Sequence, residues 1–259
     1  MKLAAGLDIR LGAAVERLEW GPWGVRAFTA DGRVYPADRA VVALPLGVLK
    51  AEGVRFVPEL PEEKRQAIER LGLTDAVKLF FRFDRPVFPP GIVELYAPGA
   101  ALEECWSNPL GHSKGIEVLT ALATGEKARA LMALPEERAL REALQALQQA
   151  LGQPSLTPSK ARLVHWRDDP YTLGAYSMAR VGASEARQVL AKPVGNRLFF
   201  AGEHTAPNAW ASTVHGAYAS GKRAAHEAIR SAYREAPLGP RRGLRPSLPP
   251  PLPDGRPAA

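Results

Sequence analysis

The stretch RLFFAGEHTAPNAWASTVHGAYASGKRAA, residues 197–225, decides the fold of this chain. Its pattern predicts a buried strand over 197–202, a short polar loop and a long helix over 213–233. A strand, a glycine turn and a helix N-terminus together form a recurring cradle for anions and cofactors. In such a cradle Gly202 lets the backbone approach a ligand closely, and Glu203 offers a carboxylate to sugar-like hydroxyl groups. On spacing alone, an ordinary strand-to-helix connection with a helix cap is the preferred interpretation.

Short strands are expected upstream of this stretch. Residues 7–48 show strand-like segments around the turn signal at Asp31 and Gly32, which predicts a β-meander. Its segments are LDIRL, AVERLEW, GVRAFTA, RVYPA and RAVVALP. Further strands are predicted at VKLFFRF, at 92–97, at 115–123 and at ARLVHW, residues 161–166.

Two helices, the second of them amphipathic, separate these strands. The first covers 61–72, with Pro61 at its first helical position and Gly72 as its stop. The second covers 135–152, has apolar residues at helical spacing and ends on Gly152. Strands and helices together predict an α/β fold of mixed (α+β) character.

The composition limits the classes of protein to which this chain can belong. With 259 residues and 46% hydrophobic content, the chain can bury a substantial core. It has no run of about 18 apolar residues, and its opening lacks the features of a secretion signal, so a cytoplasmic protein with no membrane contact is expected. The single cysteine, Cys105, excludes an intrachain disulfide.

The net charge of +7 raises the question of a nucleic-acid partner. Residues 234–259 contribute five arginines against two acidic residues, which is +3 of that charge. The remainder is scattered among acidic residues without a basic stripe, so no nucleic-acid partner is expected. The same tail is rich in proline and arginine and poor in large apolar residues, so it is expected to be disordered.

The 197–225 stretch also resembles the C-terminal FAD-binding signature of the flavin-containing amine oxidases, which include monoamine oxidases, polyamine oxidases and lysine-specific histone demethylases. Three further blocks are similar in the family's order: ADRAVVALPLGVLK (37–50), GLTDAVKLFFRFDRPVF (72–88) and WRDDPYTLGAYS (166–177). The similarity covers nearly all of residues 5–230. It implies the C-terminal part of a two-domain FAD-dependent amine oxidase fold.

The resemblance also divides the chain. The implied parts are an FAD-binding segment at 1–48, a substrate-binding domain at 49–165, a return to the FAD-binding domain at 166–233 and the tail at 234–259. Relatives begin with a Rossmann βαβ segment whose Gly-x-Gly-x-x-Gly turn holds the FAD pyrophosphate, and that turn does not occur in this sequence. The chain is therefore expected to be a fragment, the product of a misassigned start or frameshift, or one subunit of a split enzyme with a separately encoded N-terminal half.

Residue by residue, the resemblance implies a set of cofactor contacts. Glu203 matches the acid that bonds the ribityl chain. Ala175 stands where monoamine oxidases carry the flavin-bonding cysteine, which implies that FAD is held noncovalently. Trp166 and Tyr171 match aromatic positions near the flavin, although core packing also explains Trp166. The other matched positions are Val15 on the adenine side, Ala43, Leu44 and Pro45 in a turn along the cofactor, Gly202 after the strand, and Ser212, Thr213, Val214 and Ala217 at the helix start.

Lys78 is the candidate catalytic residue. In AVKLFFRF it alternates with Val77 and Leu79, a pattern that also fits the wet face of an edge strand. The resemblance matches it to the lysine that holds a water against flavin N5, and this interpretation is preferred. A cation there would orient the water and assist reoxidation of the flavin by oxygen.

Tyr176 matches one wall of the aromatic cage that holds the substrate amine. Relatives usually supply a second ring near the helix start, where this sequence has Thr213, with Trp210 nearby as a substitute. No metal is expected, because the histidines show no paired ligand spacing. They are His112, His165, His204, His215 and His226.

The resemblance implies FAD-dependent oxidation of a small amine. Hydride would pass from the α-carbon to flavin N5, the imine would hydrolyse, and O2 would reoxidise the flavin to give hydrogen peroxide. An L-amino-acid oxidase is the alternative among flavoenzymes, and it would need an arginine clamp for the carboxylate. A noncatalytic truncated remnant is the alternative outside them.

Overall fold

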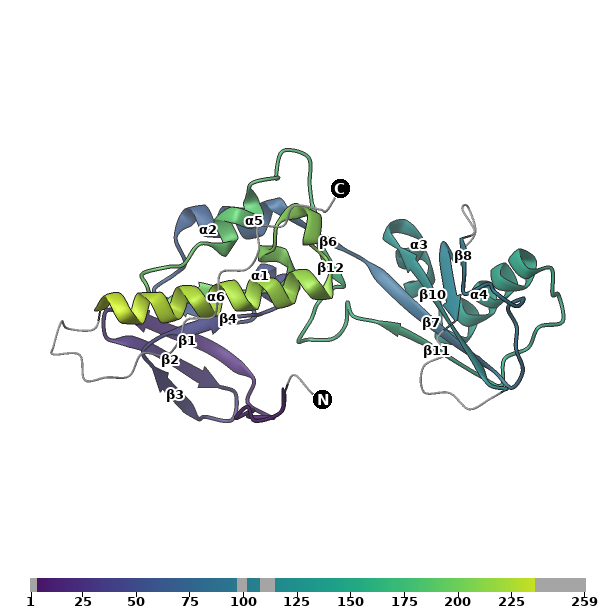
Figure 1. Cartoon of the computed structure of the whole chain (residues 1–259), viewed down its shortest axis with the longest axis horizontal. Helices are drawn as coiled ribbons and strands as arrows, with labels where there is room; N and C mark the ends of the chain where they lie inside the picture. The colour runs from purple at the N-terminus through teal and green to yellow at the C-terminus, as the bar shows by residue number, and fades with distance from the viewer. Residues whose placement is uncertain (1–3, 97–101, 108–114, 236–259) are drawn as a thin grey trace.

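The computed structural model describes residues 4–96, 102–107 and 115–235 of the chain (Figure 1). His112 and the part of the expected tail from residue 236 onward lie outside the described residues. Within these ranges, strands and helices form two units side by side, each with a hydrophobic core of its own. No helix in the described part combines the length and the apolar character needed to cross a bilayer.

The first unit is built on a four-stranded sheet in the order β3-β2-β1-β5. The antiparallel meander of β1 (Val15–Gly21), β2 (Gly24–Thr29) and β3 (Val34–Ala37) confirms the sequence prediction, and β5 (Arg55–Val57) joins β1 in parallel. The strand predicted at LDIRL is wrong. Leu7, Ile9 and Leu11 are 65%, 54% and 86% exposed, so the segment has no buried face that pairing would stabilise.

The meander ends earlier than predicted, because β4 (Ala40–Val42) leaves it and pairs in parallel with β13 (Leu198–Phe200). All three residues of β13 are at most 1% exposed. Such a continuous apolar run is typical of a strand that is covered on both faces. Helix α6 (Val214–Glu235) runs along this pair in Figure 1 and covers it.

Three shorter helices complete the first unit: α1 (Leu46–Lys50), α2 (Glu62–Arg70) and α5 (Ala186–Ala191). Pro61 is the N-cap of α2 and not its first helical residue, and Gly72 is not its stop. Leu71, fully buried, takes an extended conformation and starts β6 (Leu71–Thr74), which pairs with β12 (Tyr176–Ala179). Gly72 serves that pairing, since a Cβ there would lie 2.5 Å from Met178 Cγ.

The second unit is a five-stranded sheet in the order β11-β7-β10-β9-β8. Helices α3 (Gly125–Met132) and α4 (Glu136–Leu151) lie beside it in Figure 1, and the predicted stop of α4 at Gly152 is confirmed by a left-handed C-cap. The strands are β7 (Ala76–Phe83), β8 (Glu94–Tyr96), β9 (Glu104–Ser107), β10 (Glu117–Thr124) and β11 (Lys160–His165). Strand β7 is paired on both sides, so the edge-strand reading of Lys78 is wrong.

The hydrophobic cores divide the chain near residue 75. Residues of the 49–71 segment, such as Leu49 and Ile68, pack in the first core, although the resemblance implies that they belong to the substrate-binding domain. The second core begins at Val77 on β7 and includes the buried face of α4. Which unit serves cofactor or substrate stays a prediction.

Two segments cross between the units, one at Asp75 and one just after β11. The Asp75 carboxylate is 11% exposed and joins them, since it accepts hydrogen bonds from Arg167 Nε at 2.9 Å and from Arg129 Nη1 at 3.1 Å. A nearly buried carboxylate between two guanidinium groups fixes the direction in which the chain passes from β6 to β7.

Candidate active site

A pocket of about 580 Å³ lies where the two units meet. Segments far apart in the sequence line it: the β4–α1 turn, the β7–β10–β9 face of the second sheet, the loop before β12, and the loop after β13. Its lining residues are Ala43, Leu44, Pro45, Leu46, Gly47, Leu73, Ala76, Lys78, Trp106, Leu122, Trp166, Thr172, Gly174, Ala175, Tyr176, Gly202, Glu203, His204 and Ser212. A concave site between two packed units is a common place for a small-molecule ligand.

The turn from β4 into α1 forms one wall. Ala43 is exposed to the pocket, and Leu44 and Pro45 are half-buried beside it. The wall is held against the 172–174 loop by a close backbone approach at Gly47, where a Cβ would lie only 2.3 Å from the Thr172 carbonyl oxygen. Glycine is required there because any side chain would push the loop away.

Glu203 sits on the opposite wall, directly after the glycine turn that ends β13. Gly202 has φ 125°, a backbone conformation that side chains rarely adopt, and this sharp turn directs the carboxylate toward the pocket. Glu203 Oε1 accepts from Ser177 N at 2.9 Å, and Oε2 accepts from Ser177 Oγ at 2.6 Å and from Ser212 N at 2.7 Å. These donors fix the carboxylate in one orientation.

Arg187, on α5, also contacts the Ser177 and Glu203 side chains. Its side chain is 4% exposed, its Nη1 donates to Ser177 Oγ and lies 3.8 Å from Glu203 Oε2, and burial lowers its pKa. A buried guanidinium needs a nearby anion, and Glu203 supplies it. The sequence analysis did not identify Arg187 or Ser177, and no local motif marks either residue.

His204 is buried against the same turn, with 3% of its surface exposed. Burial lowers its pKa from 6.5 to about 4; Glu203 opposes this shift and Arg187 adds to it. The imidazole is therefore neutral near pH 7. Its ring lies over Gly202, where a Cβ would be 2.4 Å from His204 Cε1.

Lys78 enters the pocket from the second sheet. Its Nζ lies 5.6 Å from the centre of the Trp106 ring, within the range of a cation–π contact. Lys78 on β7 pairs with Leu122 on β10, and Leu122 pairs in turn with Glu104 on β9. Together with Trp106, these residues come from three adjacent strands. Burial and the neighbouring Glu94 carboxyl raise the pKa of Glu104, and Lys78 opposes that shift.

The segment from Trp166 to the first residue of β12 supplies two aromatic side chains of the lining. Tyr176 is half-buried, and burial raises its pKa, with Glu103 and Glu104 adding to the shift. Trp166 is half-buried as well, and its carbonyl oxygen accepts from Gly174 N and from Thr172 Oγ1, which closes the loop. Ala175, directly before Tyr176, also lines the pocket.

Several other residues implied by the resemblance lie outside the pocket lining. Tyr171, Trp210 and Val214 are 67%, 45% and 88% exposed. Thr213 caps α6, since its Oγ1 donates to Trp210 O and accepts from Gly216 N. Val15 packs against the first core, and Ala217 lies in the first turns of α6.

Trp106 is one of the pocket residues that sequence reasoning missed. It lies in β9, a strand of four residues that is too short to show a clear periodic pattern. Within the described ranges, no three side chains of histidine, cysteine, aspartate or glutamate are grouped as a metal site.

Comparisons with known proteins place these features in context. The family model described as "Flavin containing amine oxidoreductase" matches residues 2–229. The chain is 38% identical to "Polyamine oxidase 4" of Oryza sativa subsp. japonica, over 87% of this chain and 46% of that protein. It is 34% identical to "Lysine-specific histone demethylase 1 homolog 1" of the same organism, over 90% of this chain and 28% of that protein.

Solved structures agree on the fold. Wild-type putrescine oxidase bound to putrescine superimposes with a TM-score of 0.77 at 22% identity, covering 88% of this chain and 51% of that one. Cyclohexylamine oxidase from Brevibacterium oxydans IH-35A gives a TM-score of 0.67 at 21% identity. The chain spans about half the length of the polyamine oxidases that it matches, and less of the demethylases.

Proposed function

Because this chain belongs to the family of flavin-containing amine oxidoreductases, we propose that its pocket is part of the active site of an FAD-dependent amine oxidase. One observation supports this most: a single pocket gathers Lys78, Tyr176 and Glu203 from segments that are far apart in the sequence. We assign the flavin-facing wall to the first unit and the substrate-facing wall to the second.

The lining fits a flavin ring and the start of its sugar-like chain. The half-buried rings of Trp166 and Tyr176 offer flat apolar surfaces. Glu203 Oε1 accepts one hydrogen bond from the protein, which leaves a lone pair for a ribityl hydroxyl group. Ala175 presents a methyl group where a sulfur would be needed for a covalent link, so we propose noncovalent binding.

When bound, the flavin supplies the acceptor that takes hydride from the carbon beside the amine nitrogen and later passes the electrons to O2. The chain's own residues bind and orient. Lys78 holds a water molecule by its ammonium group and keeps positive charge at the centre of the site. Tyr176 and the neighbouring Trp106 form apolar walls for the amine.

A carboxyl group on the sheet that carries Lys78 favours an amine as the substrate. Glu104 lies on the same sheet face as Lys78, one strand beyond Leu122. The described lining contains no arginine to clamp a carboxylate, which an L-amino-acid oxidase would need. We therefore propose an amine without an α-carboxylate.

Flavin binding separates this proposal from a noncatalytic remnant. The sequence contains no Gly-x-Gly-x-x-Gly turn for the pyrophosphate, so we expect the isolated chain to bind FAD weakly, and full binding to require the remaining half of the fold. The comparisons give no support for a separately encoded half. Absorbance at the flavin bands tests both points when it is measured for the isolated chain and for a fusion of this chain to the N-terminal half of a relative. A fusion protein that binds no flavin contradicts the proposal.

A further inference from the structure

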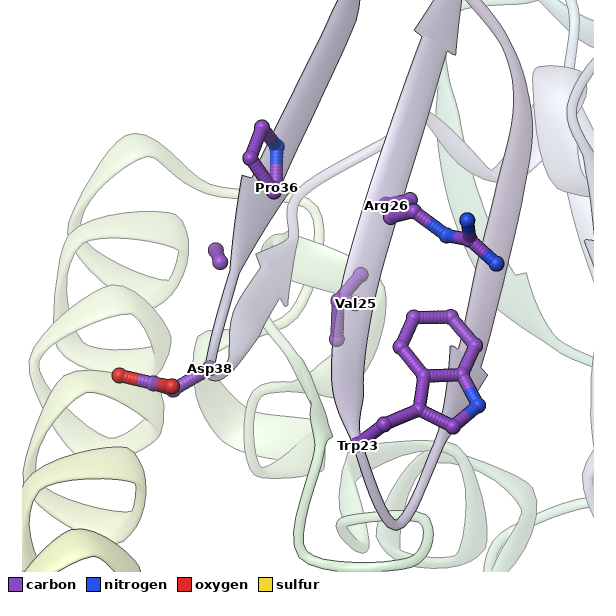
Figure 2. A pocket seen from close by; sticks show the side chains of 6 residues that line it. Trp23, Val25, Arg26, Pro36 and Asp38 are labelled. Atoms are coloured by element: carbon purple, nitrogen blue, oxygen red, sulfur yellow. The ribbon is translucent and has the colours of Figure 1, made fainter.

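A second hollow, of about 660 Å³, lies at the turn between β1 and β2, away from the pocket described above (Figure 2). It is lined by Trp23, Val25, Arg26, Pro36, Ala37 and Asp38. Trp23 is 56% exposed, which is unusual for so large an apolar side chain. An exposed tryptophan beside a proline is the kind of surface that binds extended, proline-rich peptides.

Of the charged side chains that line this hollow, the Asp38 carboxylate can still pair with a cation. Arg26 pairs with Glu19 at 3.1 Å, and its guanidinium carbon lies 4.5 Å from the centre of the Trp23 ring. Figure 2 shows the Arg26 side chain beside that ring. Asp38 points toward α6 in the same view. It forms no ion pair or side-chain hydrogen bond with any other described residue, so its carboxylate is free to pair with a cation.

Helix α6 ends in contact with residues that adjoin the hollow in sequence. The carboxylate of Glu235, its last residue, accepts from Arg39 at 2.7 Å and from Arg197 at 2.6 Å. Arg39 directly follows Asp38, and Arg197 also donates to the Pro22 carbonyl oxygen at 2.8 Å, directly before Trp23. Glu235, the last described residue before the segment, is therefore linked through two arginine side chains to the sequence neighbours of Asp38 and Trp23.

The sequence beyond Glu235 suits such a surface. Residues 237–253, PLGPRRGLRPSLPPPLP, contain seven prolines, three arginines and no acidic residue. A proline-rich chain favours the polyproline II helix, which loses little conformational entropy on binding. The Pro237-x-x-Pro240 spacing is followed at once by Arg241 and Arg242, which are close enough in sequence to reach Asp38.

We propose that the proline-rich segment 237–253 of this chain docks on its own Trp23 hollow, with proline rings against the indole and an arginine on Asp38. A tether of a few residues gives an effective concentration near the millimolar range, so even a weak contact is formed much of the time. The segment adds no packed core, which agrees with its composition.

Hydroxyl-radical footprinting with mass spectrometry tests this docking residue by residue. The full chain is compared with a full-length variant in which the seven prolines of 237–253 are changed to serine. We expect Trp23 to be oxidised about threefold faster in the variant, because a docked tether shields most of the ring. Trp210, which is 45% exposed and distant from the hollow, serves as the matched control and should not change.

Two further measurements keep the outcome clear. A synthetic 237–253 peptide added to the serine variant should restore protection of Trp23, and Asp38→Asn should weaken protection in the full chain. Equal oxidation of Trp23 in the full chain and the serine variant would overturn the proposal. So would protection that disappears on dilution, because the occupant would then be a second copy of the chain.

Discussion

Acidification should destabilise this protein through His204. Its burial lowers the folded-state pKa from 6.5 to about 4. Because the folded pKa lies below the unfolded one, the unfolded chain takes up the proton first. The stability that depends on a neutral His204 is complete above pH 6.5 and is lost as the pH falls toward about 4.

The expected loss follows from that gap. The two pKa values differ by about 2.5 pH units, and each unit is worth about 1.4 kcal/mol, so the full effect is about 3.5 kcal/mol. About 2 kcal/mol of it falls between pH 7.5 and pH 5, above the range in which most carboxylates titrate.

Urea unfolding of the purified chain at several pH values, followed by tryptophan fluorescence, measures this slope. His204→Gln removes the titrating group and should flatten the curve between pH 7.5 and 5, whatever it costs at neutral pH. His226→Gln, a partly exposed position on α6, is the matched control and should keep the slope. If His204→Gln keeps the parent slope, the buried imidazole is not the group that senses acid.

Three further substitutions test the rest of the structure. In the flavin-loaded protein, Lys78→Met should slow amine oxidation or flavin reoxidation about tenfold or more in stopped-flow measurements, whereas Arg82→Met on the same strand face should not; equal rates would remove Lys78 from the catalytic role. Asp75→Asn should lower the free energy of unfolding by about 1 kcal/mol in urea titrations, and no change would mean that its two arginine contacts add nothing. Gly47→Ala should cost about 2 kcal/mol or more by the same measurement, because the added Cβ meets the Thr172 carbonyl; an unchanged midpoint would show that the loop yields freely.

Much of this fold could be predicted because its signals are local. The alternation in AVKLFFRF, the helical spacing before Gly152 and the apolar run at 197–202 each reflect burial that the sequence records directly. The failures arise where long-range pairing decides. LDIRL alternates like a strand but pairs with no other described strand. Strand β4 pairs with β13, which is far away in the sequence, and not with the meander.

The candidate site shows the same limit. The resemblance led to Lys78, Tyr176 and Glu203, and the structure brings all three to one pocket, although their roles stay predictions. It could not lead to Arg187 or Trp106, because each becomes relevant only through its tertiary neighbours. Residues whose importance comes from what folds against them carry no signal in their own segment.

The Asp75 carboxylate has a mechanical consequence. It lies on one of the two segments that connect the units and bonds to Arg167 on the other, so both connections are pinned at one point. Any rotation of the second sheet relative to the first must then turn about that pin as a shear or hinge motion. Lys78, Trp106 and Leu122 lie on one face of the second sheet, so they would approach or leave the Glu203 wall together. The width of the pocket would then change, while the distances among these three side chains would stay the same.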